Sequence, residues 1–167
     1  MTGSMVEEME RAWEATDKDD IREVFKTLAP YLLKIAEQVK DGEDEEAVDN
    51  FFGLFGHVAE SKTAHEDWYE AMRHGGEASE MVYLTDIAAG VYSYLRKKSS
   101  LPKELGEEMD SRLLSLNDET GLFDDFSVSI YLDMLRTDER SCEEYADFES
   151  FGFDDFKEYV EEGKGKS

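Results

Sequence analysis

The chain has 167 residues and a formal net charge of −24, because it contains 42 Asp and Glu against only 18 Lys and Arg. Hydrophobic residues make up 40% of the sequence, which is enough for a folded core and argues against a disordered acidic tail. An electronegative surface of this size repels nucleic acid and anionic membranes and attracts basic partners. The length predicts a single helical domain over residues 1–163, with a disordered tail over residues 164–167.

The cysteine content and the N-terminal residues indicate the cellular compartment in which the protein is expected. Cys142 is the single cysteine, so no internal disulfide can form, as is typical of proteins in a reducing cytoplasm. Residues 1–15 are charged and amphipathic and contain no apolar signal segment. We therefore expect a cytoplasmic protein, and the sequence leaves its oligomeric state open.

Two amphipathic helices are predicted at the start of the chain. Ser4 is a suitable N-cap for a helix that ends near Ala15. Its apolar face carries one residue per turn, namely Met5, Met9 and Trp13. Asp19 or Asp20 can cap the second helix, whose apolar stripe continues to Lys40. The residues of this stripe are Ile21, Val24, Phe25, Leu28, Leu32, Ile35 and Val39.

Pro30 lies within the second helix and leaves two alternatives. Proline removes a backbone donor and clashes with the preceding turn, so the helix either kinks at Pro30 or stops just before it and restarts. Gly42 is expected to end the element as a C-cap residue. A third helix begins at the acidic residues 43–46, and its Gly53 and Gly56 predict the close approach of a neighbouring helix.

The segment 78–98 is predicted to be a central buried helix. Its apolar residues recur at helical spacing and widen until little of the cylinder is polar, which is typical of a buried helix. Thr85, Asp86 and Ser93 interrupt the apolar run, so the segment does not suit a membrane span. The stripe includes Met81, Leu84, Ala88, Val91, Tyr92 and Leu95.

The remaining segments also favour helices. Segment 126–134 alternates apolar and polar residues as a strand does, but it fits a helical period as well, and no second strand is available to pair with it. We therefore predict a helix there, with a short strand as the alternative. The predicted fold is all-α, a compact bundle of about seven to nine helices around the segment 78–98.

Acidic and aromatic residues are concentrated in a subregion over residues 118–162, which contains 16 Asp and Glu against Arg136, Arg140 and Lys157. Crowded like charges oppose folding, whereas a protein that needs only solubility can alternate them with Lys and Arg. The subregion is either an ordinary solvated face or a docking surface in which carboxylates surround aromatic anchors. The residues predicted to bind a partner are Asp138, Glu139, Glu143, Glu144, Asp147, Glu149, Phe151, Asp154, Asp155 and Glu158.

A basic protein is the partner that this charge favours, and we expect the chain to bind and inhibit it without being an enzyme. Acidic helices side by side can approach the charge density of duplex DNA, which carries one negative charge per about 1.7 Å of axis. Small acidic proteins occur among phage inhibitors of restriction and CRISPR nucleases, and among immunity proteins that neutralise basic toxins. This is an analogy of composition, since no motif links the sequence to one family. A nucleic-acid-binding defence enzyme is the first partner expected, and a basic toxin is the second.

The histidines support a competing interpretation, a small helical metalloprotein or metalloenzyme that uses residues 57–74. His57 and Glu60 are three residues apart, and Glu70 and His74 are four apart, so each pair can share a helix face. Facing helices with such pairs can bind a metal. The spacing matches no strong metal signature, and a short helix capped by Thr63 would instead place His74 in its last turn. We therefore predict no metal and no cofactor.

Catalytic motifs are absent from the sequence. It contains no G-x-S-x-G, no phosphate-binding glycine loop and no C-x-x-C, so no catalytic residue is predicted. A third interpretation is that the acidic surface reflects a high-salt habitat and has no charge-specific partner.

Overall fold

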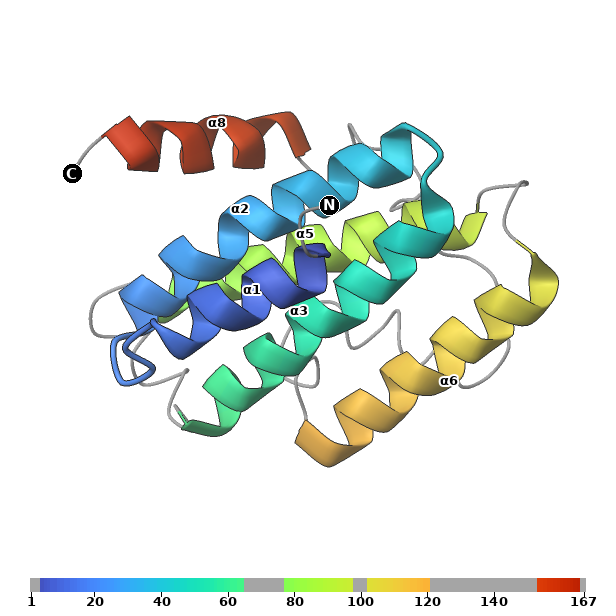
Figure 1. Ribbon diagram of the computed structural model, residues 1–167, viewed down its shortest axis with the longest axis horizontal. Helices are drawn as coiled ribbons and strands as arrows, with labels where there is room; N and C mark the ends of the chain where they lie inside the picture. Colours follow the sequence, from blue (N-terminus) through green and yellow to red (C-terminus); the bar gives the residue numbers. More distant parts are fainter. Residues whose placement is uncertain (1–3, 65–76, 98–101, 121–152, 166–167) are drawn as a thin grey trace. The chain divides into compact units, whose positions relative to one another are not determined.

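The computed structural model describes residues 4–64, 77–97, 102–120 and 153–165 (Figure 1). Their regular structure is helical, without a strand, which confirms the predicted all-α class. Segment 126–134, with its alternatives of helix and strand, lies outside the described residues, and the total number of helices stays a prediction. The helices within the described ranges are α1 (Met5–Glu14), α2 (Ile21–Lys40), α3 (Asp44–Ala64), α5 (Glu77–Lys97), α6 (Lys103–Thr120) and α8 (Phe153–Gly165).

The chain divides into two compact units, Met1–Leu84 and Thr85–Ser167. The boundary falls within α5, so α1, α2 and α3 belong to the first unit and α6 and α8 to the second. The single domain over residues 1–163 stays a prediction. Helix α8 continues to Gly165, so Lys164 and Gly165 are helical rather than part of the expected tail. The sequence suggested an earlier end because the last residues of a chain commonly fray.

Helix α1 begins and packs as its sequence predicts. The hydroxyl of Ser4 accepts a hydrogen bond from the backbone N–H of Glu7 at 3.2 Å, which satisfies one of the free donors of the first turn. Met9 and Trp13 are buried. The helix ends at Glu14, and the segment 15–20 leads into α2.

Helix α2 is one element from Ile21 to Lys40, with Pro30 inside it. The alternative in which the helix stops and restarts at Pro30 is therefore wrong. Every residue of the predicted apolar stripe is buried, on both sides of the proline. Burial of a continuous stripe favours one helix, which offsets the backbone hydrogen bond that proline cannot donate. Asp20 is the N-cap, since its carboxylate accepts the backbone N–H groups of Arg22 and Glu23.

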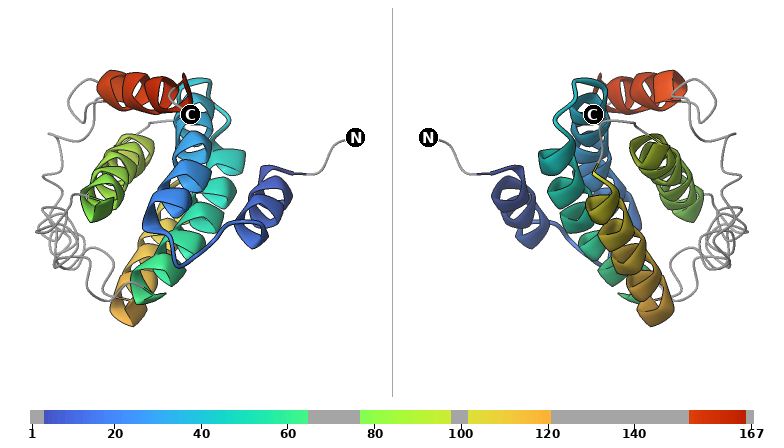
Figure 2. Two further views of the ribbon diagram at one scale, coloured as in Figure 1. Left: turned by 90° about the vertical axis from the view of Figure 1, so that its left-hand side faces the viewer. Right: turned by 90° about the vertical axis from the view of Figure 1, so that its right-hand side faces the viewer.

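Helices α2 and α3 form an antiparallel pair joined by a tight turn (Figure 1). Gly42 in this turn has a φ of 85°, the left-handed conformation that glycine adopts at helix C-termini, as the sequence predicts. Helix α1 packs against one side of the pair, in contact with both helices (Figure 2). The capping role expected of Thr63 is wrong, because α3 continues through this residue to Ala64.

The two glycines of α3 differ in their surroundings. A methyl group at Gly53 would lie 3.5 Å from Val6 Cγ2 and 3.7 Å from Met9 Cε, so α1 does approach the helix here. A methyl group at Gly56 would meet no atom within 4 Å. The predicted close approach is therefore confirmed at Gly53 and wrong at Gly56.

Helix α5 coincides with the predicted buried segment to within one residue at each end. The apolar stripe that the sequence defines is buried throughout, and Tyr92 is fully enclosed. Thr85 and Gly90 are buried as well. In the second unit, α6 buries Met109 and Leu113.

Candidate functional site

Helix α8 presents carboxylates on the side opposite its buried residues. Phe156 and Val160 are buried, and they lie within about 40° of each other around the helix axis. The exposed acidic residues of this helix are Asp154, Asp155, Glu158, Glu161 and Glu162. Tyr159 borders them and is 43% exposed, which makes it the exposed large hydrophobic residue of the described chain. Part of the predicted docking surface therefore has the expected character, an aromatic ring beside carboxylates.

The other predicted partner-binding residues lie outside the described residues. They are Asp138, Glu139, Glu143, Glu144, Asp147, Glu149 and Phe151. Of the predicted set, the structure places Asp154, Asp155 and Glu158, all of them exposed on the first turns of α8.

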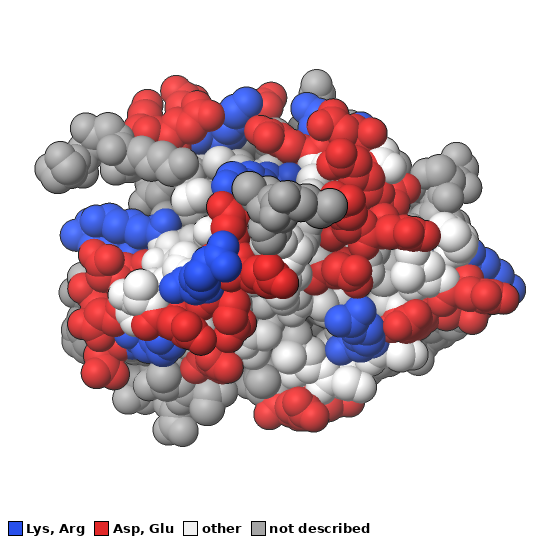
Figure 3. Space-filling view, viewed as in Figure 1, with Lys and Arg blue, Asp and Glu red and all other residues white. Residues whose placement is uncertain are grey.

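The first unit is acidic too. Residues 4–64 contain 16 Asp and Glu against 7 Lys and Arg, and all of the acidic residues except Asp44 are exposed. Figure 3 shows acidic side chains in several groups, with Lys and Arg among them. Exposed carboxylates are therefore not confined to residues 118–162.

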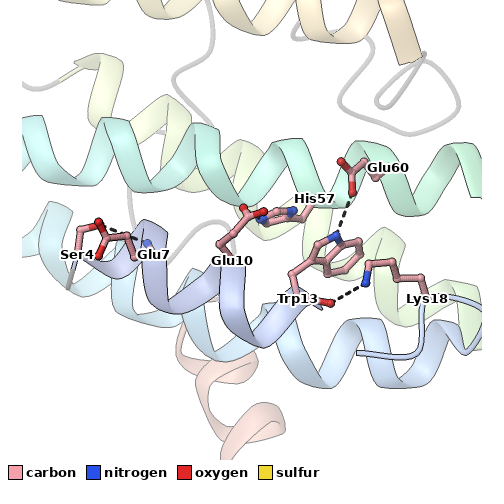
Figure 4. A network of polar contacts seen from close by, with 7 residues as sticks. All are labelled: Ser4, Glu7, Glu10, Trp13, Lys18, His57 and Glu60. Carbon is pink, nitrogen blue, oxygen red and sulfur yellow. Dashed lines mark hydrogen bonds and ion pairs between the residues drawn. The ribbon is translucent and has the colours of Figure 1, made fainter. Parts of the chain in front are cut away.

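His57 is the most unusual polar residue of the first unit. It lies on α3 and is only 9% exposed, with its imidazole stacked on the indole of Trp13 from α1 (Figure 4). His57 Nε2 lies 3.4 Å from a carboxylate oxygen of Glu10. His57 Nδ1 is buried without a hydrogen-bond partner.

Trp13 connects three segments of the first unit (Figure 4). Its Nε1–H donates to the carboxylate of Glu60 on α3 at 2.9 Å. The ammonium of Lys18 lies 5.0 Å from the ring centroid and donates to the Trp13 backbone carbonyl at 2.7 Å. A cation over the face of an indole is an attractive arrangement. The indole thus holds α1, α3 and the segment between α1 and α2 together.

Burial lowers the pKa of His57 below the usual 6.5, because an imidazolium loses hydration when it is enclosed. The carboxylates of Glu10 and Glu60 oppose this shift, and Lys18 adds to it. Neutral imidazole is therefore the form that the folded protein prefers at neutral pH.

The predicted alternative of a metal site gains no support from the described residues. No group of three or more His, Cys, Asp or Glu within them is arranged to hold a metal ion. Glu60 accepts the indole N–H of Trp13, and His57 faces Glu10. The remaining residues of the proposed metal region, His65, Glu66, Asp67, Glu70 and His74, lie outside the described part of the chain.

A polar cluster joins α5 and α6 in the second unit. The guanidinium of Arg96 donates two hydrogen bonds of 2.9 Å to the carboxylate of Asp110, and the hydroxyl of Tyr92 donates to the same carboxylate. Both carboxylate oxygens are thus occupied by partners on α5. Such a bidentate pair fixes the register of two helices, so we assign it a structural role.

Sequence reasoning missed both polar clusters. It placed Trp13 on an apolar face, which is correct, but it gave no partner to Glu10, Lys18 or Asp110. No sequence signal identifies these partners, because the contacting residues come from different helices. His57 and Glu60 do share the face of α3 that meets Trp13, as their spacing suggests, but the carboxylate at 3.4 Å from His57 is that of Glu10 on α1.

Comparisons of the chain with protein-family models, with curated proteins and with solved structures each found no match. Within the described residues, no helix has both the length and the apolar run needed to cross a bilayer.

Proposed function

We propose that this chain is a non-enzymatic cytoplasmic protein that binds a basic protein and inhibits it. The observation that carries the proposal is the exposed face of α8, where five carboxylates lie opposite the buried Phe156 and Val160 and are bordered by the exposed Tyr159. Aromatic side chains are frequent anchors at protein interfaces, and surrounding carboxylates favour cationic partners. The first partner to test is a nucleic-acid-binding defence enzyme, and a basic toxin is the second.

The charge density of α8 supports an inhibitor that imitates nucleic acid. The axial distance from Asp154 to Glu162 is about 12 Å at 1.5 Å per residue, so its five carboxylates amount to roughly one per 2.5 Å. Duplex DNA carries one charge per about 1.7 Å. A single helix of this protein therefore comes within a factor of about two of the density that a DNA-binding groove accepts. Lys157 is the one basic residue in this stretch.

A capture experiment from the native host at low salt tests the proposal. The full chain is immobilised, bound proteins are identified by mass spectrometry, and the purified partner is titrated against the chain at increasing salt. Affinity should fall steeply with ionic strength, because screening weakens attraction between exposed charges. Addition of the chain should also inhibit the nucleic-acid binding or the nuclease activity of the captured protein.

A matched pair of variants separates a docking site from general charge attraction. One variant reverses Asp154, Asp155 and Glu158 to Lys, and the control reverses Glu45, Glu46 and Asp49 to Lys. Both sets are exposed, both begin in the first turn of a helix, and both change the net charge equally. The α8 variant should lose binding by at least about tenfold more than the control. If the two variants lose affinity equally, binding depends on the net charge alone, and the assignment of the binding site to α8 is wrong.

The alternative of a high-salt habitat makes a different prediction. Carboxylate repulsion would then require salt for folding, so the protein would unfold in dilute buffer. If the chain instead binds a specific basic partner, it should remain folded in dilute buffer, as measured by circular dichroism across a salt series. Unfolding on removal of salt, without a captured partner, would favour the habitat explanation over the proposed function.

A further inference from the structure

The docking of α1 depends on a small set of contacts around one histidine. Helix α1 has 10 residues, and its buried side chains are Met9 and Trp13. The indole of Trp13 covers His57 of α3, so the imidazole lies between the two helices (Figure 4). A change in the charge of His57 therefore acts directly on one of the contacts that hold α1 against α3.

The neutral imidazole fits this position and the charged one does not. With Nε2 facing Glu10 at 3.4 Å, the neutral ring carries its proton on Nε2 and leaves Nδ1 as an acceptor. Protonation would place an N–H on Nδ1, which is buried and has no partner. An unsatisfied buried donor is destabilising, and more so on a charged group. Separation of α1 from α3 would return this nitrogen to water.

Three charged groups act on His57. Glu10 lies on α1, Glu60 on the same helix as the histidine, and Lys18 in the segment between α1 and α2. The two carboxylates favour the imidazolium, while Lys18 and burial oppose it. Burial is the largest of these effects, so protonation disfavours the docked arrangement.

We propose that His57 makes the docking of α1 a pH-sensitive latch, in which the neutral imidazole holds α1 against α3 and the imidazolium releases it. Release exposes Met9 and Trp13 and frees the N-terminal helix while α2 and α3 stay paired. Because burial lowers the pKa of His57 in the docked arrangement, the latch is closed at neutral pH and opens as the pH falls below the ordinary histidine value of 6.5. This inference does not depend on the proposed function.

Amide hydrogen exchange on the full chain tests the latch. Protection factors of α1 and α2, corrected for intrinsic exchange, are compared between about pH 8 and about pH 5. Protection of α1 should fall several-fold on acidification, while that of α2 should change less. In a His57→Phe variant the ring stack remains but the titration is lost, so α1 should keep the same protection at both pH values. Equal protection of α1 in the wild type at both pH values would overturn the proposal.

A second variant tests the direction in which the pH midpoint for release of α1 moves, and it does not alter the core. The Glu10 side chain is 54% exposed, so Glu10→Gln should fold as the wild type does. It removes a carboxylate that favours the imidazolium in the docked arrangement, so protonation opposes docking more strongly and the release midpoint should move to higher pH. A midpoint that stays in place or moves to lower pH would show that His57 is not the titrating group.

Discussion

The indole of Trp13 stacks on the imidazole of His57, with ring centroids 5.0 Å apart and ring planes inclined by 27°. The contact joins α1 to α3, and the same indole donates a hydrogen bond to Glu60. Aromatic stacking of this kind adds to the free energy gained from burial alone. Trp13 is therefore the principal anchor of α1, and its partners define the first prediction.

Replacement of Trp13 by Phe should lower the free energy of unfolding by about 1–3 kcal/mol, since a buried ring becomes smaller and the hydrogen bond to Glu60 is lost. Urea unfolding followed by circular dichroism measures the change. Glu60→Gln is the matched control, because its amide oxygen can still accept the indole N–H, and it should cost much less. A loss from Glu60→Gln equal to that from Trp13→Phe would contradict the assigned role of the indole.

Stability should depend on pH through His57. Burial lowers the pKa of His57 in the folded protein below 6.5, the ordinary value that it regains on unfolding. Between these two values the unfolded chain binds a proton that the folded chain does not, so stability rises with pH across the window. The contribution is complete above about pH 6.5 and is lost as the pH falls through the folded pKa.

The measurement is the urea midpoint of the wild type and of His57→Gln between about pH 7.5 and about pH 5. Carboxylates titrate in both proteins, so the difference between the two curves isolates the histidine. The wild type should lose stability relative to the variant as the pH falls. Parallel curves would show that the histidine has the same pKa in both states.

Gly56→Ala should stabilise the protein by about 1 kcal/mol, because alanine has the higher helix propensity and its methyl group meets no atom within 4 Å. Thermal unfolding provides the measurement. Gly42→Ala is the control of opposite sign, since φ at this position is 85° and alanine would be strained by about 1–2 kcal/mol. A destabilising Gly56→Ala would mean that a neighbour does approach this face of α3.

Gly106→Ala should destabilise the second unit, although it removes a glycine from a helix. The added methyl carbon would lie 2.7 Å from Arg96 Nη1 and 3.0 Å from Arg96 Cζ. The guanidinium must then move, and its two hydrogen bonds to Asp110 are lost. We expect a net loss of about 1 kcal/mol after the gain in helix propensity.

A double-mutant cycle checks the cause of this loss. In an Arg96→Met background the side chain at position 96 makes no hydrogen bonds to Asp110 and can move away from the added methyl group. Gly106→Ala should therefore become neutral or stabilising. If Gly106→Ala is equally destabilising in both backgrounds, the clash with the guanidinium is not its cause.

Local features of the fold were predictable from the sequence. Ser4 and Asp20 cap their helices, and Gly42 ends α2, because the chemistry of a helix end involves residues only a few positions apart. The buried faces of α2 and α5 follow from the helical period in the same way. The sequence left open whether α2 stops at Pro30 or continues through it. Burial of the apolar stripe on both sides of the proline favours the continuous helix.

The candidate surface was predictable only in its character. Asp154, Asp155 and Glu158 lie exposed as expected, since charged residues at helical spacing opposite an apolar face remain in water. Exposed carboxylates are also abundant in the first unit. Composition counts charges, but it does not show which of them form one face.

The sequence alone determined the all-α class, the capping residues of α1 and α2, the buried faces of α2 and α5, and the large excess of negative charge. These properties depend on hydrogen bonds and periodicities that operate within a few residues. Only the tertiary structure revealed that Trp13 covers His57, that Asp110 receives both Arg96 and Tyr92, and that Gly106 makes room for the guanidinium. Such contacts join different helices, and they depend on the relative position and rotation of each pair, which the apolar pattern of one helix does not specify.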